Sequence, residues 1–153
     1  MIKQLLTLAA LTFSLSASAQ THPLWMRYSA ISPDGSTIAF SYKGDIYTVP
    51  VGGGNARQLT SNAAYDAYPV WSPDGQNIAF ASTREGSMDI YLMNRNGGAP
   101  KRLTTDSGDE YPQTFRDNTH ILFSANGMPT QKSIIFAGGS FPQVYEVGTN
   151  GGR

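Results

Sequence analysis

The chain has 153 residues, a formal net charge of zero and only 14% charged residues, which argues against a nucleic-acid-binding protein, because such proteins need a basic surface to neutralise phosphates. It contains no cysteine, which excludes disulfides and thiolate metal sites. Its 16 glycines and 9 prolines, together with many Tyr, Phe, Ile and Val residues, are typical of short strands joined by tight turns.

The first nineteen residues have the pattern of a secretory signal peptide. Lys3 gives a positive start, and residues 5–15 form an apolar segment that is too short to span a bilayer. Small residues at 17–19 then match a cleavage site. We expect cleavage between Ala19 and Gln20 and a periplasmic or secreted mature protein with no membrane attachment. A buried N-terminal helix is the alternative interpretation.

After a lead-in at 20–28, the chain repeats itself about every forty residues. The stretch "YSAISPDGSTIAFS", which starts at Tyr28, returns as "YPVWSPDGQNIAFA", which starts at Tyr68. Each stretch is followed by Asp-Ile-Tyr, a glycine pair and Leu-Thr. A weaker third copy begins at Tyr111 and has Arg-Asp-Asn in place of Ser-Pro-Asp-Gly. In this copy Phe115 aligns with Ser72 without a gap, or with Trp71 after a slip of one residue.

Each copy is predicted to form four strands, called A to D here. In the second copy we expect strand A at 68–72, strand B at 78–82, strand C at 90–94 and strand D at 101–104. Pro-Asp-Gly suits the A–B turn, because Pro fixes φ, Asp bonds its own backbone and Gly adopts positive φ. The motif Asn-Gly-Gly suits the C–D turn.

Four antiparallel strands every 40 to 45 residues or so are typical of a β-propeller blade. We therefore predict an all-β chain of propeller blades at about 28–60, 68–104 and 111–153, which form a partial β-propeller at 29–153. The third blade is expected to be incomplete. Because propellers close with roughly four to eight blades, we expect a fragment of a larger propeller. A stacked β-sandwich or a solenoid is the alternative.

The N-terminal stretch "HPLWMRYSAISPDGSTIAFSYKGDIYTVPVGGG" resembles the start of tricorn-like serine peptidases. The repeats resemble, more distantly, those of TolB-type periplasmic proteins and of dipeptidyl-peptidase-IV-type propellers. The resemblance covers residues 21–153 and is more specific for fold than for function. It implies a larger protein in which propellers that admit or guide peptides precede a PDZ-like module and a domain with the catalytic serine. The chain matches none of the catalytic part.

The residues themselves predict no catalytic site, no cofactor and no metal. His22 follows the predicted cleavage site, and His120 occupies a strand entrance that Thr37 and Asn77 fill in the other copies, so neither histidine is expected to act as a base. The glycines at 52–54 lack the Lys-Ser/Thr of a phosphate loop. One turn carboxylate per blade cannot surround a calcium ion. The turn residues expected to be structural are Ser32, Asp34, Ser72, Asp74 and Asp117, and the aromatic residues expected to pack the blades are Tyr28, Tyr68, Trp71 and Tyr111.

The loops differ between the two ends of a blade. The A–B and C–D turns leave one end and are repeated, whereas the B–C loops leave the other end and grow from Phe40–Tyr47 to Phe80–Tyr91 to Phe123–Tyr145. Binding specificity commonly resides in variable loops that a rigid scaffold holds in place. We expect this end to meet a peptide or protein ligand, although the loops could instead pack against the rest of the parent chain. The expected ligand-facing residues are Asp66, Asp106, Asp109, Glu110, Asn126, Gln131 and Lys132.

These inferences predict the non-catalytic propeller portion of an exported tricorn-like serine peptidase, which acts in substrate access or docking. Its partners would be a peptide or protein ligand and the remainder of the parent chain, namely further blades and PDZ-like and protease domains. One alternative is a periplasmic TolB-like interaction propeller without enzymatic activity. Another is an exopeptidase whose hydrolase domain follows a propeller.

Overall fold

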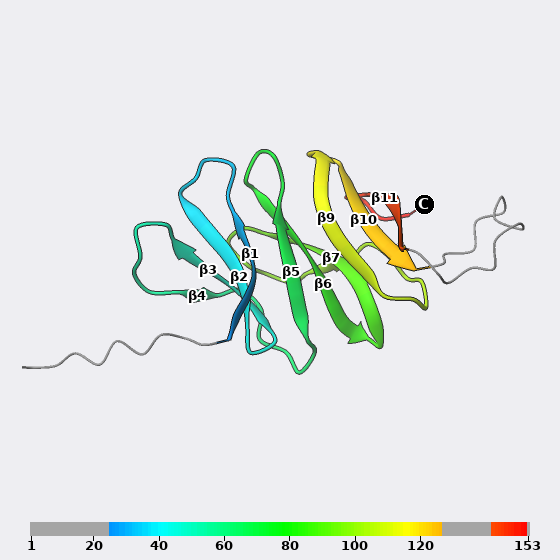
Figure 1. Ribbon diagram of the computed structural model, residues 1–153, viewed down its shortest axis with the longest axis horizontal. Helices are drawn as coiled ribbons and strands as arrows, with labels where there is room; N and C mark the ends of the chain where they lie inside the picture. The colour runs from blue at the N-terminus through cyan, green and yellow to red at the C-terminus, as the bar shows by residue number, and fades with distance from the viewer. Residues whose placement is uncertain (1–24, 127–141, 153) are drawn as a thin grey trace, which may run out of the picture.

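The computed structural model describes residues 25–126 and 142–152. The regular structure of these residues is entirely β, with eleven strands and no helix. The described residues therefore include no helix that could cross a membrane. The strands form three antiparallel sheets that stand side by side (Figure 1). This arrangement confirms the predicted all-β chain of two complete blades and one incomplete blade.

The strands of each sheet follow one another in chain order. Blade 1 consists of β1 (Met26–Ile31), β2 (Thr37–Tyr42), β3 (Asp45–Pro50) and β4 (Arg57–Gln58). Blade 2 consists of β5 (Asp66–Trp71), β6 (Asn77–Glu85), β7 (Ser87–Asn94) and β8 (Lys101–Arg102). Blade 3 consists of β9 (Glu110–Asp117), β10 (His120–Asn126) and β11 (Pro142–Gly148). The fourth strands are shorter than expected, because only two residues of each pair with the neighbouring strand.

The Ser-Pro-Asp-Gly motif builds the A–B turn. In blade 2 the Ser72 hydroxyl donates to the Asp74 carboxylate at 2.6 Å and accepts from the Asn77 amide at 2.9 Å. The same carboxylate accepts from the Gln76 amide, and Gly75 has a φ of 66° that favours glycine. Ser32 and Asp34 repeat this network in blade 1. The prediction that these serines and aspartates are structural turn residues is therefore confirmed.

The third A–B turn is one residue shorter than the other two. Phe115 pairs with Ile121 in blade 3, as Trp71 pairs with Ile78 in blade 2, which settles the alignment in favour of the one-residue slip. Asp117 still caps the turn by accepting from the Thr119 amide at 2.8 Å. Arg-Asp-Asn thus replaces Ser-Pro-Asp-Gly without loss of the turn carboxylate.

The repeated Leu-Thr pair attaches the fourth strand to the third. The Thr60 hydroxyl accepts a hydrogen bond from the Ile46 amide, and the Thr104 hydroxyl accepts one from the Ile90 amide, both at 2.9 Å. The preceding leucine amide donates to the same isoleucine's carbonyl at 2.8 Å in each blade. A threonine side chain therefore continues the pairing where the backbone ladder ends.

The hydrophobic core lies between the sheets. One cluster, between blades 1 and 2, includes Ile46, Trp71 and Phe80. A second, between blades 2 and 3, includes Ala79, Ile90 and Phe123. Ala79 and Phe80 belong to different clusters because consecutive strand residues point to opposite faces of a sheet. Blade 2 is therefore covered on both faces.

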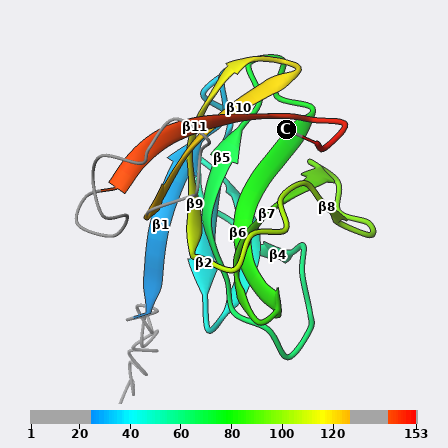
Figure 2. The same ribbon diagram turned by 90° about the vertical axis from the view of Figure 1, so that its right-hand side faces the viewer.

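The first strands of the blades are neighbours. β1 contacts β5, and β5 contacts β9. Figure 2 shows these three strands towards one side of the molecule and β4 and β8 towards the other. The order from first to fourth strand thus runs in the same direction in every complete blade.

Candidate binding face

The end of the blades that carries the B–C and D–A loops is called the variable end here, and the structure divides its predicted ligand-facing residues into two groups. Asp66 and Glu110 are completely buried and begin strands β5 and β9, rather than lying in exposed loops. Asp109 and Asn126 are exposed, and Asp106 is half-buried. Gln131 and Lys132 lie outside the described residues. Asp109 and Asn126 are therefore the exposed members among the described residues of the set.

Asp66 forms an internal ion pair with Arg84. Its carboxylate lies 2.7 Å from Nη2 of Arg84, a residue of β6, and accepts from the Asn62 side chain at 3.2 Å. The Arg84 guanidinium also lies over the rings of Phe80 and Tyr91, at 5.5 and 5.2 Å from their centroids. This carboxylate therefore holds the B–C hairpin of blade 2 against strand A.

Glu110 occupies the equivalent place in blade 3 but has a different environment. Neither of its carboxylate oxygens has a hydrogen-bond partner among the described residues. Burial, the largest cause, and the nearby Asp89 carboxylate raise the pKa of Glu110 to about 7, although the neighbouring Thr104 hydroxyl and Arg102 guanidinium act to lower it. Asp89 is itself buried and pairs with Arg102 at 2.9 Å, and burial raises its pKa as well. Glu110 is thus a buried acid that titrates near neutral pH.

Asp109 positions the loop between blades 2 and 3. Its carboxylate accepts from the Met88 amide at 3.0 Å and from the Tyr111 hydroxyl at 3.4 Å. The Asp106 carbonyl accepts from the Ser87 hydroxyl at 3.2 Å. These contacts fix the loop to β7, so this part of the variable end has a defined conformation.

Three tyrosines form a row along the first strands. The rings of Tyr28 and Tyr68 are 3.9 Å apart, and their hydroxyls are 3.1 Å apart. Tyr68 meets Tyr111 edge to face at 5.0 Å. The hydroxyl contact with Tyr28 is the largest of the causes that raise the pKa of Tyr68 to about 12. The row confirms that these residues pack blade against blade, although Tyr28 keeps 36% of its surface exposed.

Tyr28 and Tyr68 also share an unusual backbone conformation. Their φ angles are 52° and 58°, in the left-handed region that bulky residues seldom adopt. Each lies at a β-bulge, where one extra residue interrupts the pairing of strand A with strand B. The repeated tyrosine was visible in the sequence, but no local signal indicated the bulge that directs its side chain.

A small cavity at the variable end was not anticipated from the sequence. It encloses about 190 Å³ beside the B–C turn of blade 1, and its lining includes Trp25, Arg27, Lys43 and Tyr65. The Arg27 guanidinium lies 5.7 Å from the Trp25 ring centroid. Trp25 and Tyr65 are 63% and 39% exposed. Two aromatic rings and two cations therefore line one cavity, to which residues of β1, the B–C turn of blade 1 and the segment before β5 contribute.

The described residues do not assemble a catalytic or metal centre. His120 is close to Asp117 and Thr119, which both contact the same ring nitrogen, Nδ1, at 3.0 Å, and the Glu146 carboxylate lies 3.9 Å from Nε2, too far for a hydrogen bond. A relay needs the nucleophile and the orienting acid on opposite nitrogens. Within residues 25–126 and 142–152, no group of three or more His, Asp or Glu side chains could hold a metal ion.

Three fanned antiparallel sheets in chain order, with cores between them, define part of a β-propeller. The family model for the tricorn protease N-terminal beta propeller domain matches residues 23–153. The chain therefore belongs to the tricorn protease N-terminal β-propeller family, and it is related to both tricorn proteases and TolB proteins.

Individual relatives are much longer than the region they share with this chain. Tricorn protease homolog 1 of Streptomyces coelicolor is 33% identical over 82 residues, which cover 54% of this chain and 8% of that protein. The Tol-Pal system protein TolB of Desulfosudis oleivorans is 39% identical over 61 residues, which cover 37% of this chain and 14% of that protein. Among solved structures, a putative TolB from Agrobacterium tumefaciens has a TM-score of 0.70 at 22% identity, with 87% of this chain and 49% of that chain covered.

Proposed function

We propose that this chain is the non-catalytic propeller portion of an exported tricorn-like serine peptidase, where it acts in substrate access or docking. The observation that carries the proposal is the family match over residues 23–153, which includes every described strand.

The variable end supplies the docking surface in this proposal. Its B–C loops differ in length from copy to copy in the sequence, whereas the A–B turns of blades 1 and 2 at the other end share one hydrogen-bond network. The exposed rings of Trp25 and Tyr65, with the cations Arg27 and Lys43 beside them, offer apolar and polar contacts to an extended peptide. Asp109 and Asn126 add exposed polar groups on the side of blade 3.

The test replaces residues 126–140 with a Gly-Ser linker of equal length in the complete gene product. We expect the KM for a peptide substrate to rise several-fold while kcat for a small chromogenic ester is unchanged, because docking but not chemistry is affected. Val51→Thr, an exposed change at the opposite end, is the control. Unchanged peptide turnover and affinity after loop replacement would overturn the docking role.

Export is proposed from residues 1–19. N-terminal sequencing of the protein recovered from a periplasmic or culture-fluid fraction should give Gln20 as the first residue. Recovery of an uncleaved chain from the cytoplasm would contradict this assignment.

A periplasmic TolB-like interaction propeller without enzymatic activity is the second candidate, and the TM-score of 0.70 to a putative TolB supports it. The coding sequence after residue 153 separates the candidates. A PDZ-like module followed by a serine protease domain supports the peptidase, whereas blades alone support the interaction protein. A Gly-x-Ser-x-Gly elbow in a doubly wound domain would instead indicate an exopeptidase.

A further inference from the structure

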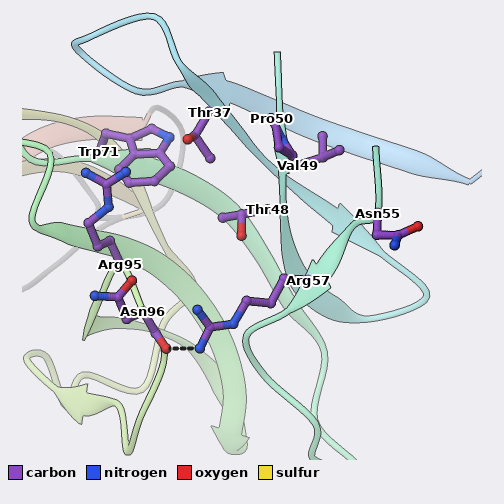
Figure 3. A pocket seen from close by; sticks show the side chains of 9 residues that line it. All are labelled: Thr37, Thr48, Val49, Pro50, Asn55, Arg57, Trp71, Arg95 and Asn96. Atoms are coloured by element: carbon purple, nitrogen blue, oxygen red, sulfur yellow. Dashed lines mark hydrogen bonds between the residues drawn. The ribbon is translucent and has the colours of Figure 1, made fainter. Parts of the chain in front are cut away.

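A cleft of about 280 Å³ opens between blades 1 and 2 at the end of the A–B and C–D turns, opposite the variable end. Blade 1 contributes Thr48, Asn55 and Arg57, and blade 2 contributes Trp71, Arg95 and Asn96 (Figure 3). The cleft is the size of a site for a small chemical group rather than for a whole peptide.

Two arginine side chains are held in place in this cleft. Nη2 of Arg57 donates to the backbone oxygen of Asn96 at 2.6 Å, across the blade junction (Figure 3). The Arg95 guanidinium lies 5.7 Å from the centroid of the Trp71 ring, which is itself fixed by an indole hydrogen bond to the Ala30 carbonyl at 3.1 Å. Since a guanidinium has five N–H donors, each arginine keeps donors for a ligand.

The positive charge of the cleft is not neutralised by the residues that line it. None of its lining residues is acidic, so the two guanidinium groups give it a formal charge of +2. Asp34 is close enough for Arg95 to lower its pKa, but the hydrogen bonds from Ser32 and Ser36 are the larger causes. Thr48 is only 8% exposed and lines the same cleft. A buried hydroxyl and two cations favour an anion as the missing partner.

The blade architecture does not require the second cation. The Arg57 contact recurs between blades 2 and 3, where Lys101 Nζ donates to the Asn150 carbonyl at 2.8 Å. Arg95, in contrast, follows Asn94 at a turn position that Val51 fills in blade 1 and Thr149 in blade 3; all three amides donate to the A–B turn of their own blade. The Arg95 guanidinium is therefore specific to blade 2 and is not needed for the repeated turn.

We propose that this cleft is an oxyanion-binding site, in which Arg57 and Arg95 hold one carboxylate or phosphate group and Thr48 donates a further hydrogen bond. The group can come from the acidic side chain of a peptide or from a free inorganic anion, since both present the same kind of oxygens to guanidinium donors. The site lies at the opposite end from the proposed docking loops and is independent of them.

Trp71 provides a reporter in the full chain once the second tryptophan is removed by Trp25→Phe. The probes are inorganic phosphate, N-acetyl-glutamate N-methylamide and the matching glutamine derivative. We expect a saturable change in Trp71 fluorescence with phosphate or with the glutamate derivative, and none with the glutamine derivative. Arg95→Thr, which installs the residue of blade 3, should weaken binding at least tenfold. Lys101→Gln, which alters the same structural contact at the other blade junction, should leave binding unchanged.

The relative affinities of phosphate and the glutamate derivative identify the source of the anion. NMR of the arginine Nε–H groups in the unsubstituted chain provides a second measurement that does not depend on any variant. Both arginine signals should shift with the same saturation curve. No saturable response to either anion, equal affinity in Arg95→Thr, or binding of the neutral glutamine derivative would overturn the proposal.

Discussion

Asp66 and Glu110 start equivalent strands, opposite Ser82 and Ala125, yet Asp66 forms a direct ion pair and Glu110 forms none with the described residues. Arg84 lies 2.7 Å from Asp66, which compensates for the loss of water around that carboxylate. The Glu110 carboxylate has no hydrogen-bond partner among the described residues, so burial favours its protonated form. Sequence reasoning placed both in exposed loops, because it could not detect that the first strands begin earlier than the repeated tyrosine.

The raised pKa of Glu110 predicts a pH-dependent stability. The folded protein holds this proton with a pKa of about 7, against an ordinary value of 4.5. Protonated Glu110 therefore contributes to the free energy of unfolding fully below pH 4.5, and this contribution is lost as the pH rises through 7. At 1.36 kcal/mol per pKa unit, the loss amounts to about 3 kcal/mol. Glu110→Gln should remove this fall between pH 4.5 and 7 in chemical denaturation curves. Glu85→Gln, an exposed change, should keep it; identical pH profiles for Glu110→Gln and the unsubstituted chain would contradict the assignment.

The turn serine gives a second prediction at this scale. Ser72 is fully buried and links the Asp74 carboxylate to the Asn77 amide. Ser72→Ala leaves both groups without this partner and should lower the free energy of unfolding by about 1–3 kcal/mol. Ser36→Ala, at an exposed hydroxyl of the blade 1 turn, is expected to change it by less than about 0.5 kcal/mol. Equal denaturation midpoints for the two variants would show that the buried turn bonds contribute nothing.

At the scale of the element, a side-chain hydrogen bond supplements the short backbone pairing of the fourth strands. β4 and β8 each pair through two residues only, and the threonine two residues after each strand supplies the next hydrogen bond. The Leu-Thr repeat predicted that a strand exists here, but the length of the strand could not be predicted. The sequence pattern is the same whether the isoleucine amide donates to a backbone carbonyl or to the threonine hydroxyl.

Thr104→Val tests this interpretation, because valine keeps the shape and removes the acceptor for the Ile90 amide. The variant should lose about 1–3 kcal/mol of unfolding free energy and should lose hydrogen-exchange protection at the Ile90 amide. Thr105→Val, at the exposed neighbouring position, should change neither. Retained protection of the Ile90 amide in Thr104→Val would mean that strand D is held by other contacts.

At the scale of the whole molecule, stability arises between the blades, because both hydrophobic clusters join residues of neighbouring sheets. The forty-residue repeat made this arrangement predictable, since each copy carries the same strands, turns and apolar positions. The sites were less predictable. Arg57 and Arg95 come from different blades, and only the packing of one sheet against the next brings them to the same cleft.

The docking role of the variable end is the central claim. A photo-crosslinking amino acid placed at Asn126, an exposed residue of the variable end, should capture a peptide substrate without acidic residues in the complete, catalytically inactivated gene product. The same amino acid at Gln76, an exposed residue of an A–B turn at the opposite end, should capture little. Mass spectrometry of the crosslinked peptides gives the ratio. Strong capture at position 126 with competition by unlabelled peptide is the predicted result; equal capture at both positions, or capture at position 76 alone, would contradict the account.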